Sequence, residues 1–197
     1  MALLTLSAIF LLDLLTTGQL VNHTIDDTLG DDHTGFQVDY SPLIWKNSSQ
    51  CSDSAIVPDR SMAMNDTWTG ATYYPALRNM TAKLVFHGSA IYVYLIVSNY
   101  PESSDTICDF RMDGDMVGSY RHDADGTYEF QYGVLAYSNA SLSSDDHTLL
   151  IETTGTQSSY VIFDYAIYMY VVGSSIFLVI DILTFAETPE HPSRLRI

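Results

Sequence analysis

Basic residues are scarce in this sequence. Lysine and arginine together number 8, whereas aspartate and glutamate number 24, which gives a formal net charge of -16. A surface of this sign repels nucleic acid and anionic lipid headgroups, since both are recognised through clustered cations. We therefore expect no nucleic-acid partner. An acidic, aromatic and lysine-poor composition is typical of an extracellular surface that meets cations or neutral ligands.

Cysteine is almost absent, and only Cys51 and Cys108 occur. They form no C-x-x-C motif and no zinc-ligand spacing with histidine. In an oxidising compartment two cysteines often pair, so we expect a Cys51–Cys108 disulfide. In the chain-entropy model such a bridge contributes about 4 kcal/mol to stability. Two separate thiols are the alternative.

Catalytic and cofactor motifs are missing too. The sequence contains no G-x-S-x-G, no H-E-x-x-H and no P-loop. Glycosidases need a pair of carboxylates about 5 to 9 Å apart, but such a pair would not indicate a glycosidase here, because so acidic a chain will contain one by chance. Nothing among the six histidines points to a Ser/His/Asp triad. We expect neither an enzyme nor a cofactor.

The first eighteen residues, MALLTLSAIFLLDLLTTG, resemble a secretory signal peptide. Residues 3–12 form an apolar run of suitable length, and the small residues Thr16, Thr17 and Gly18 follow it. The stretch lacks a basic beginning and contains Asp13, so a buried N-terminal helix is the alternative.

Asparagine is rare, yet five of the six asparagines begin an N-x-[ST] triplet, and only Asn99 does not. These triplets are acceptors for N-glycosylation and mark exposed turns of chains on the secretory route. Accidental triplets in a Ser/Thr-rich chain are the alternative. We predict a glycoprotein that is secreted or held on the extracellular side of the plasma membrane, with glycans at Asn22, Asn47, Asn65, Asn79 and Asn139.

No long segment has a helical period, and short β-rich runs recur instead. Residues 106–112 alternate polar and apolar side chains before Asp113-Gly114, which predicts a hairpin. Turn residues recur every ten to twenty positions, which indicates a β-sandwich or barrel. Residues 41–82 are looser and predict long connections with one or two short strands. The expected strands lie within residues 84–97, 106–115, 128–138, 147–155 and 160–170.

The end of the chain is unusually apolar. Residues 165–180 carry no charge, but as a helix they would span roughly 24 Å, short of a bilayer core of about 30 Å. Extension to Phe185 includes Asp181, and part of the segment already has a strand pattern. Membrane attachment therefore stays open, as does the oligomeric state. We expect a signal peptide at 1–18, a β-sandwich ectodomain at 19–170, and an apolar then polar tail at 171–197.

Nine segments form a recognisable series along the chain. In order, they are TIDDTLGDDHTGFQVDYSP, Trp45, VPD, NDTWTGATYYP, FHGSAIYVY, DFRMDG, YGVLAYSNASL, HTLLIE and FDYAIY. This series resembles a group of uncharacterised secreted or membrane-anchored glycoproteins of mushroom-forming fungi. The resemblance covers about residues 22–170 and implies a galactose-binding-like jelly-roll ectodomain with no established activity. The group usually continues into a Ser/Thr-rich stalk, which is lacking here, and many members carry paired cysteines where this chain has Cys51 alone.

The acidic stretch TIDDTLGDDHTG, residues 24–35, has two interpretations. Jelly rolls of the kind that the resemblance implies often hold a structural calcium near the first strand, which would use Asp26, Asp27 or Asp31. The spacing is not that of an EF-hand, however. We expect no metal; instead, residues 25–28 begin the first strand and residues 31–35 form an Asx-type turn. We also expect residues 22–28 to pair with residues 160–168, with Asp27 and Asp164 at polar positions on strands that have one wet face.

Aromatic residues are the best functional lead. Sugar rings stack on Trp and Tyr, while their hydroxyl groups bond to Asp, Asn and Arg. The loop-rich half contains Trp45, Trp68, Tyr73 and Tyr74, where binding residues tend to lie. We expect non-catalytic recognition of cell-wall or other extracellular carbohydrate. The alternative is a structural or protein-binding surface glycoprotein without a small ligand, in which both tryptophans fill the ends of the core.

Overall fold

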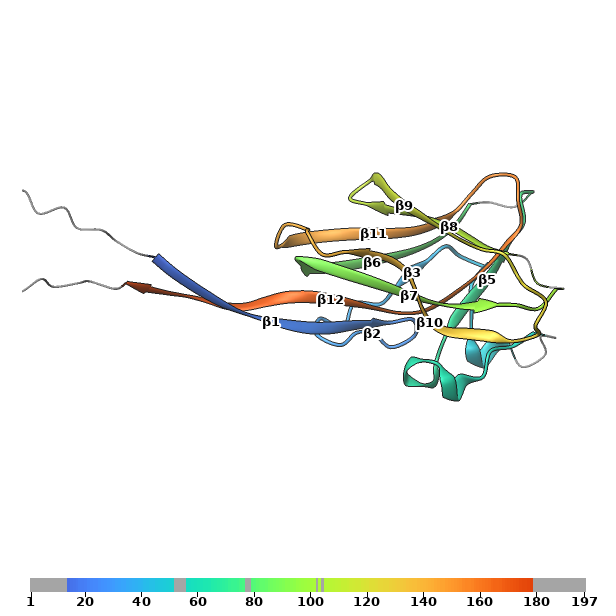
Figure 1. Ribbon diagram of the computed structural model, residues 1–197, viewed down its shortest axis with the longest axis horizontal. Coiled ribbons are helices and arrows are strands. Elements are labelled where there is room, and N and C mark those ends of the chain that lie inside the picture. The colour runs from blue at the N-terminus through green and yellow to red at the C-terminus, as the bar shows by residue number, and fades with distance from the viewer. Residues whose placement is uncertain (1–13, 52–55, 77–78, 102, 104, 179–197) are drawn as a thin grey trace, which may run out of the picture. The chain divides into compact units, whose positions relative to one another are not determined.

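The computed structural model describes residues 14–51, 56–76, 79–101, 103 and 105–178 (Figure 1). Residues 1–13 of the expected signal peptide and residues 179–197 of the expected tail lie outside this range. Residues Gln19–Val172 form one compact unit, which contains the structure discussed below. A second unit comprises residues 1–18 and 173–197, and its described parts are the outer ends of two strands.

Within the described residues the chain is built almost entirely of β-strands, joined by three short 3₁₀ helices. The strands are β1 (Leu14–Asp26), β2 (Gly30–Asp31), β3 (Asp39–Tyr40), β4 (Lys46–Asn47), β5 (Thr69–Tyr73), β6 (Met80–Gly88), β7 (Ala90–Ser98), β8 (Thr106–Met112), β9 (Asp115–His122), β10 (Phe130–Asn139), β11 (Asp145–Thr153) and β12 (Ser159–Leu178). The 3₁₀ helices are η1 (Ser48–Gln50), η2 (Arg60–Met62) and η3 (Met64–Asp66).

The strands form two antiparallel sheets that lie in two layers (Figure 1). The seven-stranded sheet has the order β10-β7-β12-β1-β2, and it is extended where β5 pairs with β12 and β4 pairs with β5. The five-stranded sheet has the order β3-β6-β11-β8-β9. The predicted all-β class and antiparallel β-sandwich are confirmed.

The core between the sheets follows from strand alternation. In β8 every second side chain is buried, and Cys108 and Phe110 point into the core with the exposed side of the strand carrying Asp109 and Arg111. On the facing sheet, β7 sends Leu95 and its alternate neighbours into the same cluster. Each fully buried aliphatic side chain contributes roughly 1.5–3 kcal/mol, so this pattern is what holds the two layers together.

A second apolar cluster lies on the other face of the seven-stranded sheet. Ile96 of β7 and Ile162 of β12 belong to it, whereas the residues beside them in both strands point into the main core. Trp68 and Cys51, from the long connection between β3 and β5, pack onto these two isoleucines. This connection therefore has its own small core instead of being a loose loop.

This arrangement corrects the expected disulfide. Cys108 is a buried thiol in the core between the sheets, whereas Cys51 belongs to the cluster on the opposite face of the seven-stranded sheet. The sheet separates the two sulfur atoms, and the Cys51–Cys108 bond is not formed. Burial also raises the pKa of the Cys108 thiol, which keeps it protonated and unreactive.

The predicted hairpin at Asp113-Gly114 is confirmed. Met112 of β8 pairs with Asp115 of β9, which leaves a two-residue turn between them. Both turn residues have positive φ, 53° at Asp113 and 96° at Gly114, as the mirror-image turns of tight hairpins require. Asp113 also accepts a 2.8 Å hydrogen bond from the main-chain amide of Thr148, which ties the turn to β11.

The predicted meeting of the first and last strands is also confirmed. β1 and β12 are neighbours in the seven-stranded sheet and run in opposite directions (Figure 1). Just beyond the end of β1, the amide of Asp27 donates a 3.1 Å hydrogen bond to the carbonyl oxygen of Asp164. The expected start of the first strand at residue 25 is wrong, however, because β1 ends at Asp26. Among the described residues there is no helix long and apolar enough to cross a membrane.

Candidate functional site

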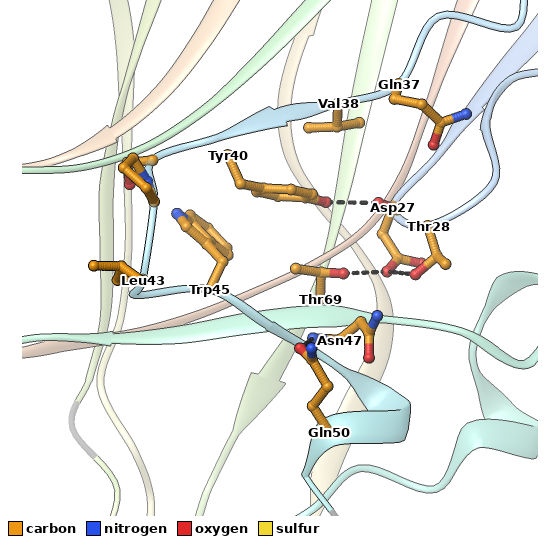
Figure 2. Close-up of a pocket in the computed structure, with 12 residues that line it drawn as sticks. Asp27, Thr28, Gln37, Val38, Tyr40, Leu43, Trp45, Asn47, Gln50 and Thr69 are labelled. Carbon is orange, nitrogen blue, oxygen red and sulfur yellow. Dashed lines mark hydrogen bonds between the residues drawn. The ribbon is translucent and has the colours of Figure 1, made fainter.

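A pocket of about 370 Å³ opens where the end of β1 meets the connection between β2 and β5 (Figure 2). It combines one buried carboxyl group, two aromatic rings, an exposed apolar side chain, and several hydroxyl and amide groups. Its lining residues are Asp27, Thr28, Gln37, Val38, Tyr40, Ser41, Pro42, Leu43, Trp45, Asn47, Gln50 and Thr69.

Asp27 lies at one side of the pocket, and its side chain is held firmly. Its Oδ2 accepts hydrogen bonds from Thr28 Oγ1 (2.6 Å) and Thr69 Oγ1 (2.5 Å), while its carbonyl oxygen accepts one from Tyr40 Oη (2.9 Å) (Figure 2). Oδ1 is buried and has no hydrogen-bond partner among the described residues. Burial raises the pKa of Asp27, although the threonine hydrogen bonds act in the opposite direction.

Tyr40 and Trp45 form an aromatic wall. Their ring centroids are 5.0 Å apart, with an angle of 41° between the planes. Because the Tyr40 hydroxyl group is committed to Asp27, its ring is fixed in place. The Trp45 side chain is half-buried, and its Nε1 is shielded without a partner among the described residues. Trp45 therefore presents the ring carbons, not the N–H group, to the pocket.

Leu43, at the rim, is exposed over 103% of its reference area, although it is apolar. Its backbone is left-handed, with φ at 69°. A bulky residue in this conformation costs roughly 1–3 kcal/mol, and such strain is concentrated at functional sites. An exposed apolar side chain on strained backbone at the mouth of a pocket is a contact surface that folding alone does not require.

The remaining wall is made of uncharged amides. Asn47 caps η1 and Gln50 is its last residue. Gln50 Oε1 accepts a 3.2 Å hydrogen bond from the Asn47 amide, and the Asn47 side chain accepts one from the Gln50 amide. Gln37 is fixed by a 2.9 Å hydrogen bond from its Nε2 to the Leu29 carbonyl oxygen. No lysine or arginine is among the described residues that line the pocket.

Of the four predicted ligand-binding residues, only Trp45 reaches this pocket. Trp68 is 1% exposed in the cluster on the outer face of the sheet, and Tyr73 is buried, with its hydroxyl group donating to the Gly155 carbonyl oxygen at 2.9 Å. Neither can contact a ligand without unfolding, so both assignments are corrected. Tyr74 is 53% exposed but does not line the pocket. The four side chains therefore do not form one site.

Tyr40, Leu43 and Thr69 are site residues that sequence reasoning missed. Tyr40 and Trp45 lie five positions apart in a proline-containing segment, and this aromatic pair was a usable signal. Thr69 gives no such signal, because its role depends on contact with Asp27, which is 42 positions earlier in the chain. Only the pairing of β5 with β12, beside β1, brings these two together.

Three of the four aspartates in the acidic stretch, Asp26, Asp27 and Asp31, are buried instead of forming a wet sheet edge, whereas Asp32 is exposed. Asp26 Oδ1 accepts hydrogen bonds from the amides of Thr28 (3.0 Å) and Leu29 (2.8 Å), and Oδ2 accepts one from Asn65 Nδ2 (2.8 Å). Asp26 therefore closes the turn between β1 and β2 and ties it to η3. The expectation that Asp27 and Asp164 face solvent is wrong, because both are at most 3% exposed.

The expected Asx-type turn at Asp31 is confirmed. Asp31 accepts hydrogen bonds from the His33 amide (2.9 Å) and Thr34 Oγ1 (2.6 Å), and Tyr168 Oη of β12 donates to the same carboxylate at 3.1 Å. The side chain thus orders the turn and anchors it to the sheet. Over the described part of the chain, no group of three or more His, Cys, Asp or Glu side chains is placed to hold a metal ion.

Asp164 is the most perturbed carboxyl group near the pocket. It is 1% exposed, and its Oδ1 accepts a 3.0 Å hydrogen bond from the Met64 amide. Burial raises its pKa from 3.8 to about 7, and the nearby charges of Asp27 and Asp26 act in the same direction. Because this group is buried and its pKa is raised, we expect its titration to affect the stability of the fold.

The five sequon asparagines differ from Asn99 in exposure. All five sequon asparagines are exposed or half-buried. Asn99, which lies outside any sequon, is 1% exposed, and its Oδ1 is within hydrogen-bond distance of His122 Nε2 at 2.8 Å. The structure is therefore compatible with a glycan at Asn22, Asn47, Asn65, Asn79 and Asn139.

No protein-family model matches the sequence, and the search of curated proteins finds no match. Among solved structures, the Agl-KA catalytic domain is similar with a TM-score of 0.46 and 10% identity, over 84% of this chain and 30% of that one. The catalytic domain of GH87 alpha-1,3-glucanase in complex with nigerose gives 0.38 and 7%, over 80% and 29%. TmCBM61 in complex with beta-1,4-galactotriose gives 0.35 and 12%, over 69% and 88%. This chain thus spans less than a third of the two catalytic domains, and similarities this distant carry no argument about ligand or activity.

Proposed function

We propose that this β-sandwich is a non-catalytic extracellular domain that recognises neutral carbohydrate in the pocket beside Asp27. The observation that carries the proposal is the combination of a fixed aromatic wall, Tyr40 and Trp45, with uncharged hydrogen-bonding groups around one mouth. Sugars need both, because their C–H faces pack on rings and their hydroxyl groups need donors and acceptors.

The charge of the pocket supports a neutral ligand. Its described lining has no cation, and the whole chain has a formal charge of -16. Phosphorylated or sulfated ligands would meet repulsion without a compensating Lys or Arg. A neutral saccharide carries no such penalty, and the Asn47, Gln50 and Gln37 amides can both donate and accept.

The absence of catalysis is part of the same proposal. Glycoside hydrolysis uses two carboxyl groups that flank the scissile bond. Among the described lining residues Asp27 is the one acid, and its Oδ1 is shielded while Oδ2 is bound by two threonines. An extracellular location is supported by the sequon asparagines, since each is exposed or half-buried and none is fully buried.

A glycan array tests this function when it is probed with the protein as secreted and again after enzymatic trimming of the protein's own glycans to the first sugar. We expect binding to neutral oligosaccharides, which Trp45→Ala should reduce at least tenfold in isothermal titration, equivalent to about 1.4 kcal/mol. Tyr74→Ala is the matched control, because Tyr74 is an exposed aromatic residue outside the pocket. If no glycan binds the trimmed protein, or if Trp45→Ala and Tyr74→Ala bind equally well, the proposal fails.

A structural surface glycoprotein without a small ligand is the second candidate. It is favoured by the burial of Trp68 and Tyr73, which serve packing and not recognition. An array without any bound glycan, together with a normally folded and secreted protein, would support it.

A further inference from the structure

We propose that an N-linked glycan on Asn47 regulates the pocket by covering its mouth. This inference rests on the proposed extracellular, glycosylated state of the chain. Asn47 has two properties that coincide nowhere else in the described chain: it begins the sequon Asn47-Ser48-Ser49, and it lines the pocket. Asn22, Asn65, Asn79 and Asn139 are not lining residues.

The Asn47 side chain is held in a way that leaves its glycosylation atom unused. Its Oδ1 accepts a 2.7 Å hydrogen bond from Ser49 Oγ, and the side chain also accepts one from the Gln50 amide. The Asn47 Nδ2 atom forms no hydrogen bond with any of the described residues. Figure 2 shows the Asn47 side chain on the same side of the pocket as Gln50, below Thr69.

The modification preserves these contacts. In N-glycosylation a bond forms between Nδ2 and the anomeric carbon of the first sugar, while that carbon's bond to a lipid-linked diphosphate breaks. The diphosphate carrier leaves with the electron pair, and the displaced amide proton is lost to solvent. Oδ1 remains an acceptor, so Ser49 and Gln50 continue to fix the side chain, and the sugar starts from a defined place on the pocket wall.

The attached glycan belongs to the class of ligand that the pocket is suited to bind. An attached group competes at an effective concentration of roughly millimolar when its tether is short. Free neutral oligosaccharides of weak affinity would be displaced by it. The aromatic wall of Tyr40 and Trp45 would then be covered whenever Asn47 carries a glycan. The fraction of molecules with an open pocket is therefore set by the fraction that lack a glycan at Asn47.

Tryptophan fluorescence tests the proposal without any ligand. The chain has two tryptophans, of which Trp68 is 1% exposed and Trp45 lines the pocket. Quenching by acrylamide therefore reports mainly on Trp45. Wild type is compared with Ser49→Ala, which removes the Asn47 sequon. Both proteins are secreted from a eukaryotic host.

Ser141→Ala is the matched control, because it removes a second Asn-x-Ser sequon at Asn139, outside the pocket. That asparagine keeps its 2.9 Å hydrogen bond from the Ser141 main-chain amide. Enzymatic trimming of wild-type glycans to the first sugar provides a further comparison, since it leaves the sequence and the Ser49 hydrogen bond unchanged.

We expect the quenching constant to rise at least twofold in Ser49→Ala and after trimming, because Trp45 becomes accessible while Trp68 stays buried, and to stay at the wild-type value in Ser141→Ala. Mass spectrometry should find the Asn47 peptide modified. An unmodified Asn47 in the secreted protein, or equal quenching in all forms, would overturn the proposal. If quenching rises as expected but the opened Ser49→Ala protein binds no sugar on the array, the glycan cover stands and the carbohydrate function fails.

Discussion

The main-chain amide of Asp27 donates a 3.1 Å hydrogen bond to the carbonyl oxygen of Asp164, which brings two buried carboxyl side chains close together on neighbouring parts of one sheet. Asp26, also buried, adds a third. Burial and mutual repulsion both oppose ionisation of such groups. The acidic surface of this protein thus continues into its interior, and stability depends on pH as a result.

Acidification from pH 8 to pH 5 should stabilise the fold. Burial raises the pKa of Asp164 from 3.8 to about 7. The folded state therefore holds a proton that the unfolded state releases, and this stabilisation is fully present below about pH 4 and lost as the pH rises through about 7. We expect the melting temperature, followed by circular dichroism, to rise by several degrees over this range.

Asp164→Asn should remove most of that dependence. The amide mimics the protonated acid and keeps an oxygen for the Met64 amide, so the variant should melt higher than wild type at pH 8. If the melting temperature of the variant changed with pH as steeply as that of wild type, other groups or the net charge of -16 would dominate the effect.

Removal of the Thr69 hydroxyl group should lower the free energy of unfolding, because this group binds the buried Asp27 side chain in the pocket. Thr69→Val keeps the shape but leaves Asp27 Oδ2 with Thr28 alone as side-chain donor, at a cost of about 1–3 kcal/mol for a buried polar group that loses a partner. Urea unfolding measures the loss. Thr69→Ser keeps the hydroxyl group and should stay close to wild type; equal losses in both variants would trace the effect to packing.

Trp68 should behave as a core residue. Trp68→Ala removes the largest side chain of the second apolar cluster, which Trp68 forms with Cys51, Ile96 and Ile162. Such a truncation should lower the free energy of unfolding by about 3–5 kcal/mol. Chemical denaturation should place its unfolding midpoint far below that of Trp45→Ala. If Trp68→Ala retained wild-type stability and lost sugar binding instead, the assignment of the two tryptophans would be reversed.

Leu43→Gly should separate stability from binding. Glycine adopts the left-handed backbone at φ 69° without strain, so the variant should gain up to about 1 kcal/mol in unfolding free energy. At the same time it removes the exposed apolar side chain from the rim, and affinity for a saccharide found on the array should fall. A variant that is less stable than wild type would argue against strain at this position.

Cys108 should be unreactive in the folded protein. Because it is buried and its pKa is raised by burial, maleimide labelling should occur only after denaturation. Peptide mapping without reductant should find no link to Cys51, and a reducing agent should leave the melting temperature unchanged. A linked peptide would restore the disulfide and require a different register for the connection between β3 and β5.

Alternating patterns made much of the sandwich predictable. Residues 84–97 lie in β6 and β7, which are consecutive strands in opposite sheets, and the break falls at Ser89, one residue after the predicted Gly88. Residues 106–115 form β8, its turn and the start of β9, and residues 160–170 lie within β12. These segments succeed because half-buried strands leave a period of two in the sequence, and because Asp-Gly fixes a tight turn locally.

The site was less predictable, because its parts depend on which face of a sheet each strand presents. Trp68 looks like a loop aromatic in sequence, and only the outward side chains of Ile96 and Ile162 make it a core residue. Cys51 and Cys108 are separated in the same way, because they lie on opposite faces of the seven-stranded sheet. Asp27 was assigned to a wet edge because a single sequence does not reveal that Thr69 and Tyr40 will enclose it.

The place of β12 in the sheet has a consequence for biosynthesis. This strand, the last in the described chain, lies between β7 and β1 and also pairs with β5. Until residues 159–169 emerge from the ribosome, the edges by which those earlier strands pair with β12 have no partner. Such edges template aggregation, and pairings across long sequence separations form slowly. The nascent chain therefore exposes unpaired β-edges until translation of the sandwich is complete.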